Sequence, residues 1–238
     1  MSVSSDGFRA HDPSFQDIIG SSPSLEKILS NPSYPFAHEA GVFFSDANEL
    51  WVTSNRIYDD KGEQHIIISK IRLSANRDAP PVQEEVTIEQ FHMGNGGVNY
   101  GSGILFCSQG SATIPSGLYY TDPKATRNTK PILTSVYGKP FNSVNDVVIA
   151  QDGSIWFTDP PYGFEQGYKE CPQLPSQLYR YSPTTKAIRA LADGFGHPNG
   201  LCFSPDEKTL YVTDTDKVHG SGVLRPHLAS SMYVAPLG

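Results

Sequence analysis

The sequence predicts an all-β fold, a β-propeller with about four blades, because it carries a long internal repeat of strand-like composition. The segment "NSVNDVVIAQDGSIWFTD" (residues 142–159) returns as "HPNGLCFSPDEKTLYVTD" (residues 197–214). Aligning the two copies places Asn145 on Asn199, a shift of 54 residues. A shift of 106, two repeats, places Glu39 of "HEAGVFF" on Asn145. Repeats of this length are typical of propellers, because one blade cannot bury both faces of its small sheet alone.

Within each repeat, strand-like runs alternate with turn signals. "SIWFTD" and "TLYVTD" are rich in β-branched and aromatic residues, and each follows a turn containing Asp152-Gly153 or Pro205-Asp206. Third strands are expected at "IIISKIRL", "SGLYYTD" and "QLYRYSP", with a weaker one at "SMYVAPL". No long window has a helical period, and only residues 24–30 favour a short helical turn.

The repeats also divide the chain. Residues 1–35 are expected to be an N-terminal extension, and residues 36–238 the propeller domain. The repeat after the first should begin near residue 92, where "NGGVNYGSGILFCSQG" supplies a strand but only a blurred copy of the pattern.

Composition and charge exclude several classes of function. The 238 residues carry a formal net charge of −7 and no basic run, so no nucleic-acid partner is expected. The chain has no stretch of about 18 apolar residues and no apolar signal core in "MSVSSDGFRAHDPSF", so we expect a cytoplasmic protein without membrane attachment. Cys107, Cys171 and Cys202 lack metal-like spacing and are expected to be reduced thiols.

A polar residue opens three of the repeats, and packing alone does not explain it. The first strand of each propeller blade lines the central axis, so Glu39, Asn145 and Asn199 should point at one common place. One carboxylate and two amide oxygens suit a hard cation such as calcium, and the lack of His or Cys argues against zinc. Taken singly, each asparagine is more typical of a turn before a strand than of a metal ligand. The shared register of the three residues favours the metal site.

Three segments carry a family resemblance. They are "FNSVNDVVIAQDGSIWFTDPPYG", "QLYRYSPTTKAIRALADGFGHPNGLCFSPDEKTLYVTDT" and "YGSGILFCSQG". Together with the flanking sequence, roughly residues 36–215, they resemble the gluconolactonase, senescence marker protein and regucalcin-like family, in particular its fungal-type members. The resemblance implies a six-bladed calcium-dependent lactonase propeller. It also implies hydrolysis of a small-molecule lactone or related ester at an axial divalent cation. Calcium is the expected ion, with zinc, manganese and magnesium as alternatives.

The resemblance also suggests roles for individual residues. Glu39 and Asn199 look like cation ligands, and Asn145 looks like a residue that contacts both the cation and the substrate. Asp146 resembles an aspartate that in some members takes part in proton transfer or in a second metal site, and it is the candidate catalytic base. The alternative for Asp146 is an aspartate that closes the turn at the start of a strand.

Two departures from the family pattern stand out. Ala40 replaces the glycine that usually follows the first-blade glutamate. No "PDG" motif follows Asp214 to supply a fifth-blade carboxylate, and a six-bladed ring at this period would need roughly 320 residues. We therefore expect a chain truncated relative to the family. The alternatives to a hydrolase are a non-catalytic propeller that binds a protein or metabolite, and an inactive truncated product.

A loop and a histidine are further candidates for function. "TDPPYG" opens a long loop that either covers a pocket or only turns the chain after a strand. His197 has no partner at metal-like spacing and is expected to be an ordinary polar or packing residue.

Overall fold

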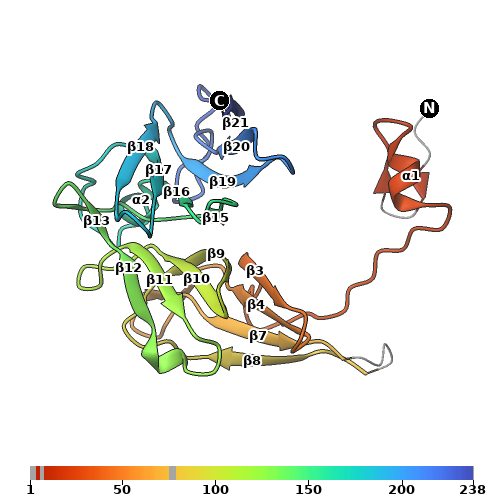
Figure 1. Cartoon of the computed structure of the whole chain (residues 1–238). Coiled ribbons are helices and arrows are strands. Elements are labelled where there is room, and N and C mark those ends of the chain that lie inside the picture. Colours follow the sequence, from red (N-terminus) through yellow and green to blue (C-terminus); the bar gives the residue numbers. More distant parts are fainter. Residues whose placement is uncertain (1–3, 6–7, 75–78, 238) are drawn as a thin grey trace.

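The computed structural model describes residues 4–5, 8–74 and 79–237. Within these residues, the strands form four small antiparallel sheets that follow one another around an arc (Figure 1). Each sheet is one propeller blade, and its first strand lies on the concave inner side of the arc (Figure 1). The prediction of an all-β propeller with about four blades is confirmed.

The blades are consecutive in the sequence, and three of them have four strands in the described part of the chain. Their strands, in order from the inner strand outward, are β3 (Glu39–Phe44), β4 (Glu49–Thr53), β7 (Ile68–Arg72) and β8 (Val82–Val86); β9 (Gly94–Tyr100), β10 (Gly103–Ser108), β11 (Gly117–Thr121) and β12 (Lys130–Leu133); β15 (Val147–Ile149), β16 (Ile155–Asp159), β17 (Gln177–Tyr181) and β18 (Ile188–Ala192); and β19 (Pro198–Phe203), β20 (Thr209–Asp214) and β21 (Ser231–Pro236).

The remaining elements are short and lie outside the blades. They are the two-stranded sheets β1 (Ser4–Ser5) with β2 (Phe8–Arg9), β5 (Ile57–Tyr58) with β6 (Gln64–His65), and β13 (Ser135–Val136) with β14 (Lys139–Pro140), and the helices α1 (Phe15–Ile19), α2 (Tyr162–Glu165) and the 3-10 turn η1 (Thr126–Asn128). Among the described residues, no helix is long and apolar enough to span a membrane.

The expectation of a helical turn at residues 24–30 was wrong, because that segment is irregular. The turn of helix in this part of the chain is α1, which lies apart from the blades in Figure 1. The Asp12 carboxylate precedes it and accepts hydrogen bonds from the main-chain nitrogen and hydroxyl of Ser14. This local turn favours a helix start there, whereas the apolar side chains of the irregular segment, Leu25 and Ile28, are exposed.

An aspartate at the end of the second strand explains part of the repeat. The two carboxylate oxygens of Asp159 accept hydrogen bonds from the main-chain nitrogens of Ser143 and Asn142, at 2.7 and 2.9 Å. Asp214 binds the nitrogens of His197 and Gly196 at the same distances. Each aspartate therefore holds the segment that leads into the first strand of its own blade. The aspartate of the repeated "TD" thus fixes the backbone that leads into the inner strand by accepting main-chain hydrogen bonds.

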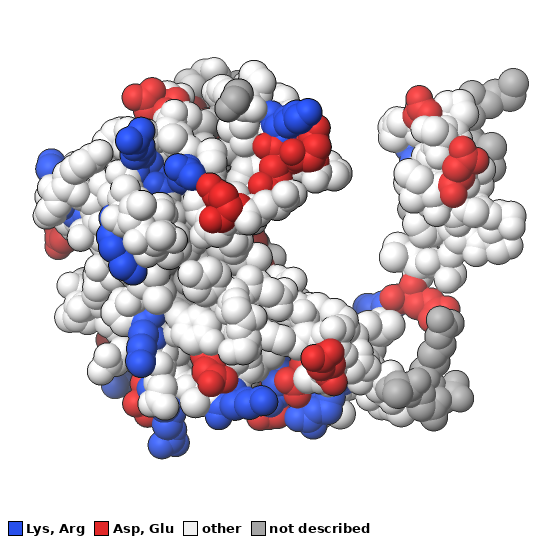
Figure 2. Space-filling view, in the orientation of Figure 1, with Lys and Arg blue, Asp and Glu red and all other residues white. Residues whose placement is uncertain are grey.

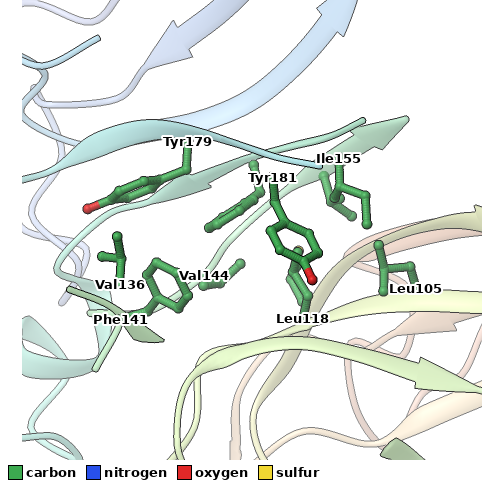
Figure 3. Packing of buried hydrophobic residues seen from close by; sticks show 11 residues of the cluster. Leu105, Leu118, Val136, Phe141, Val144, Ile155, Tyr179 and Tyr181 are labelled. Atoms are coloured by element: carbon green, nitrogen blue, oxygen red, sulfur yellow. The ribbon is translucent and has the colours of Figure 1, made fainter. Parts of the chain in front are cut away.

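Hydrophobic clusters lie between successive blades and account for the aromatic residues of the repeat. The largest joins the second and third blades (Figure 3), with Phe157 stacked on Tyr179 at a centroid distance of 5.4 Å and Phe141 edge-on to Phe157 at 5.2 Å. Equivalent clusters surround Trp51 between the first two blades and Trp156 between the last two. Burying a side chain of this size contributes about 1.5–3 kcal/mol, so neighbouring blades stabilise one another.

Candidate functional site

The first strands of the four blades are neighbours around the axis. β3 contacts β9, β9 contacts β15, and β15 contacts β19. Glu39 is the first residue of β3, Asn199 is the second residue of β19, and Asn145 lies two residues before β15. The predicted site residues therefore lie at corresponding ends of the inner strands. Figure 2 shows that the surface is hollowed between the first and fourth blades.

Asp146 links the third and fourth blades. Its Oδ1 accepts a hydrogen bond from the main-chain nitrogen of Val147 at 2.9 Å, and its Oδ2 accepts one from Leu201 at 3.2 Å. Burial raises the pKa of the Asp146 carboxyl, although the two N–H donors oppose this effect. The aspartate is thus a buried, oriented carboxylate at the start of β15, and its contact with the fourth blade goes beyond closing a turn.

Glu39 lies close enough to Asp146 for the two carboxylates to repel one another. Burial, and to a smaller extent the charge of Asp146, raise the pKa of Glu39 to about 7. His38 approaches Glu39 only at 4.0 Å, and burial lowers the pKa of that imidazole. When ionised, the carboxylates of Glu39 and Asp146 therefore create a negative potential at the inner strands of the first and third blades, which a cation would neutralise.

Two amide oxygens at this site have no donor. The side chains of Asn145 and Asn95 are buried, with 3% and 7% of their surface exposed. Within the described residues, neither Oδ1 atom accepts a hydrogen bond. Leaving a buried acceptor unpaired costs about 1–3 kcal/mol, so such atoms call for a structural or functional explanation.

Asn95 is the residue that the sequence analysis missed. The Thr53 hydroxyl donates a hydrogen bond to the carbonyl oxygen of Asn95 at 3.0 Å, as the Thr158 hydroxyl does to Asn199 at 2.7 Å. Asn95 therefore occupies in the second blade the place of Asn199 in the fourth. It follows the position expected from the repeat, near residue 92, by three residues. The repeated threonine at or next to the end of the second strand, Thr53 and Thr158, was the signal that could have located Asn95.

Gly96, the residue after Asn95, lies where the second blade packs closely on the third. The main-chain nitrogen of Gly96 donates to the carbonyl oxygen of Asn145 at 2.8 Å. A Cβ atom at Gly96 would lie 2.6 Å from that oxygen and 2.6 Å from Oδ1 of Asp146. A side chain at this position would displace both candidate site residues. Within "GNGG", Gly96 therefore allows the backbone of the second blade to approach Asn145 and Asp146 closely.

The donor set is built from oxygen atoms. Within the described residues, no three His, Cys, Asp or Glu side chains cluster in a way that could hold a metal ion by themselves. The candidate oxygen donors at the starts of the inner strands are the carboxylates of Glu39 and Asp146 and the amides of Asn95, Asn145 and Asn199. Carboxylate and amide oxygens are ligands for hard cations.

The cysteines add no thiolate ligand to this set. Cys107, Cys171 and Cys202 form no disulfide in the described structure, as expected from their spacing. Cys107 is buried in β10, and burial raises the pKa of its thiol, with the charges of Asp146 and Glu39 adding to the effect. A thiol that stays protonated is a poor metal ligand.

The solved structures that resemble this chain are propellers. A gluconolactonase of Xanthomonas campestris superposes with a TM-score of 0.56 at 27% identity, covering 77% of this chain and 56% of that one. A structure described as a putative gluconolactonase superposes with a TM-score of 0.52 at 23% identity and supports the fold alone.

Curated sequences agree with the structural likeness. Lactonohydrolase oryL of Aspergillus oryzae is 31% identical over 226 residues, which is 92% of this chain and 49% of that protein. Lactonohydrolase oryH of the same fungus is 26% identical over 84% of this chain and 53% of its own length. The gluconolactonase of Zymomonas mobilis is 38% identical over 100 residues, 40% of this chain and 27% of that protein. The chain thus spans about half the length of the two lactonohydrolases.

The family model for the SMP-30/gluconolactonase/LRE-like region matches residues 100–219, which include the third blade, the long loop after β16 and most of the fourth blade. This match covers half of the chain and contains Asn145, Asp146 and Asn199. The resemblance expected from the sequence motifs is confirmed, and the chain belongs to the SMP-30/gluconolactonase/LRE-like family.

Proposed function

We propose that the site at the inner strands binds a divalent cation, with calcium the ion we expect, and hydrolyses a lactone or a related ester. The observation that supports this proposal best is the pair of buried, unpartnered Oδ1 atoms of Asn95 and Asn145 in the same site as the repelling carboxylates Glu39 and Asp146. A hard cation would satisfy the two oxygens and neutralise the two charges together. The donor set therefore fits such an ion.

The proposed ligands are Glu39, Asn145 and Asn199, and we add Asn95 to them because its buried Oδ1 is unpaired. When bound, the cation would polarise the lactone carbonyl as a Lewis acid and lower the pKa of a nearby water. With its oxygen directed to the cation, Asn145 can donate from its Nδ2 hydrogens to a substrate oxygen. The donor would hold the lactone and stabilise the charge that develops on the carbonyl oxygen.

Asp146 would act as the general base. Its oxygens each accept one main-chain N–H, which leaves each oxygen free to accept a further proton donor. A water oxygen bonds to the carbonyl carbon while Asp146 takes its proton. The ring C–O bond then breaks, and Asp146 returns the proton to the departing ring oxygen, which gives a hydroxy acid. The raised pKa of Asp146 suits this role, because a more basic carboxylate accepts the proton more readily.

Proton release from glucono-δ-lactone, followed at constant pH against the spontaneous rate, tests the proposal. We expect hydrolysis in calcium, loss of hydrolysis in chelator, and recovery when calcium is restored. Asp146→Asn should lower the rate by about 10² to 10⁴. Asp193→Asn, at an exposed aspartate of the third blade, should leave it unchanged.

Two outcomes would contradict the proposal. Hydrolysis that persists in chelator and in Asp146→Asn would show that another site performs the reaction. Calcium binding without hydrolysis of any lactone in a panel of ring sizes would favour the alternative of a non-catalytic propeller.

A further inference from the structure

The side chain of Asn199 is held by a tyrosine from the neighbouring blade. Its Nδ2 donates a hydrogen bond to the hydroxyl of Tyr162 at 3.0 Å. Tyr162 opens α2, in the long loop that follows β16, and is 9% exposed. Its hydroxyl also lies 2.6 Å from the Thr215 hydroxyl, just beyond β20. The "DPPYG" loop therefore reaches a candidate cation ligand and does more than turn the chain.

The ring of Tyr162 cannot easily move away from this position. It stacks on the imidazole of His197 at a centroid distance of 5.4 Å and an interplanar angle of 23°. His197 is 2% exposed, and its Nε2 and Nδ1 atoms lie 2.9 Å from Glu165 and 3.0 Å from Asp216. The imidazole is thus clamped at both nitrogens by loops of two blades.

Arg225 completes the clamp. Its guanidinium contacts Oε1 of Glu165 at 2.7 Å and Oδ1 of Asp216 at 3.2 Å, so one cation joins both carboxylates that hold His197. Gly196 makes room for this arrangement, because a Cβ there would collide with the Asp216 side chain. A partly buried network with every member paired restricts motion, and it keeps the Tyr162 hydroxyl in one place.

An asparagine amide presents either an oxygen or an NH₂ group, and only the oxygen can bind a cation. Because Tyr162 accepts from Nδ2, the Oδ1 atom of Asn199 is directed elsewhere. We propose that Tyr162 is a positioning residue that fixes the amide of Asn199 with its oxygen available to the cation. This inference rests on the proposed cation site and adds to it a residue whose own side chain binds neither cation nor substrate.

Calcium affinity, measured by titration calorimetry with the metal alone, distinguishes a role of Tyr162 in orienting the Asn199 amide from a role in the stability of the fold. Tyr162→Phe removes the hydroxyl and should weaken calcium binding about fivefold, the equivalent of one hydrogen bond of about 1 kcal/mol. In an Asn199→Asp background both terminal atoms of the side chain are oxygen. Tyr162→Phe should therefore lower calcium affinity less than about twofold in that background. Tyr168→Phe removes a hydroxyl from the same loop, bonded to Gln109 at 2.8 Å, and should leave affinity unchanged.

A second measurement does not depend on metal. The side-chain amide protons of Asn199, assigned by their absence in Asn199→Asp, should include one that exchanges slowly in metal-free protein and rapidly in Tyr162→Phe. Unchanged exchange in Tyr162→Phe, or the same affinity loss in both backgrounds, would overturn the inference. A folded wild-type chain without calcium affinity would refute the proposed function. The exchange rates would still decide whether Tyr162 orients the amide.

Discussion

The hydroxyl of Thr158 donates a hydrogen bond to the main-chain carbonyl of Asn199, 2.7 Å away, and so ties the second strand of one blade to the first strand of the next. The same hydroxyl accepts a hydrogen bond from the main-chain nitrogen of Asp146 at 3.2 Å. Thr158 is fully buried. One side chain therefore fixes the backbone of a candidate ligand and of the candidate base.

Thr158→Val keeps the shape of this residue and removes its hydroxyl. The carbonyl of Asn199 and the nitrogen of Asp146 would each lose a buried partner, so we expect the free energy of unfolding to fall by about 1–3 kcal/mol. Because both partners belong to the site, calcium should also stabilise the variant less than it stabilises the wild type. Denaturant unfolding with calcium and with chelator measures both effects.

Thr121→Val is the matched control for this change. Thr121 is also fully buried, and its hydroxyl lies 3.0 Å from that of Thr129 at the outer side of the second blade. It should lose stability while keeping the full calcium effect. An equal loss of the calcium effect in both variants would mean that Thr158 serves the fold alone.

Gly96→Ala tests the close approach of the second and third blades. The added methyl group would lie 2.6 Å from the Asn145 carbonyl oxygen, closer than real contacts allow, so backbone at the site must shift. We expect a loss of stability of about 1–3 kcal/mol and weaker calcium binding. Gly41→Ala, where a Cβ meets nothing within 4 Å, should change neither property. Wild-type calcium affinity in Gly96→Ala would contradict this placement of Asn145.

The pH dependence of the metal-free protein should report on Glu39. Its pKa is about 7 in the folded chain against an ordinary value of 4.5, so between these values the folded state holds a proton that the unfolded state has released. Stability therefore decreases as pH rises through this window. Burial raises the pKa of Asp146 and Asp159 as well, and both add to the same trend. Thermal melts in chelator between pH 5 and pH 8 measure the slope.

Glu39→Gln isolates the glutamate's share of that slope. The variant should lose less stability than the wild type as pH rises in chelator, because the amide does not titrate. Calcium should flatten the wild-type slope in the same way by stabilising the carboxylate. A slope that neither the substitution nor calcium alters would show that Glu39 is not the buried, cation-facing carboxylate described above.

The sequence predicted the propeller and its inner strands because the repeat carries the packing requirement directly. Trp51, Phe157 and Tyr211 lie at equivalent places in the second strands and pair with Val42, Val147 and Cys202 of the first strands. It missed Asn95 because the second repeat is only a blurred copy of the motif, and the asparagine lies three residues after the position that the period predicts. The shift in register at the start of β9 recurs in β3 and β19, so it does not distinguish the second blade.

The contacts of His197 with Glu165 and Asp216 could not be predicted from the sequence, for a different reason. His197 was expected to be an ordinary polar or packing residue, and it is buried between Glu165 and Asp216, which lie 32 residues before it and 19 residues after it. Loops of two different blades bring these groups together. Their meeting depends on how the blades pack, which no local motif records.

Thermal unfolding of the wild type and of Asn145→Leu, each with calcium and with chelator, tests the central claim most directly. Leucine has the same branched arrangement of four side-chain heavy atoms as asparagine but no hydrogen-bond acceptor. Calcium at about 100 times its dissociation constant should stabilise the wild type by roughly 2.7 kcal/mol and the variant much less. In chelator the variant should be at least as stable as the wild type, because the unpaired buried oxygen is gone. A wild type that calcium does not stabilise, or a variant less stable by the same amount in both conditions, would contradict a cation site at Asn145.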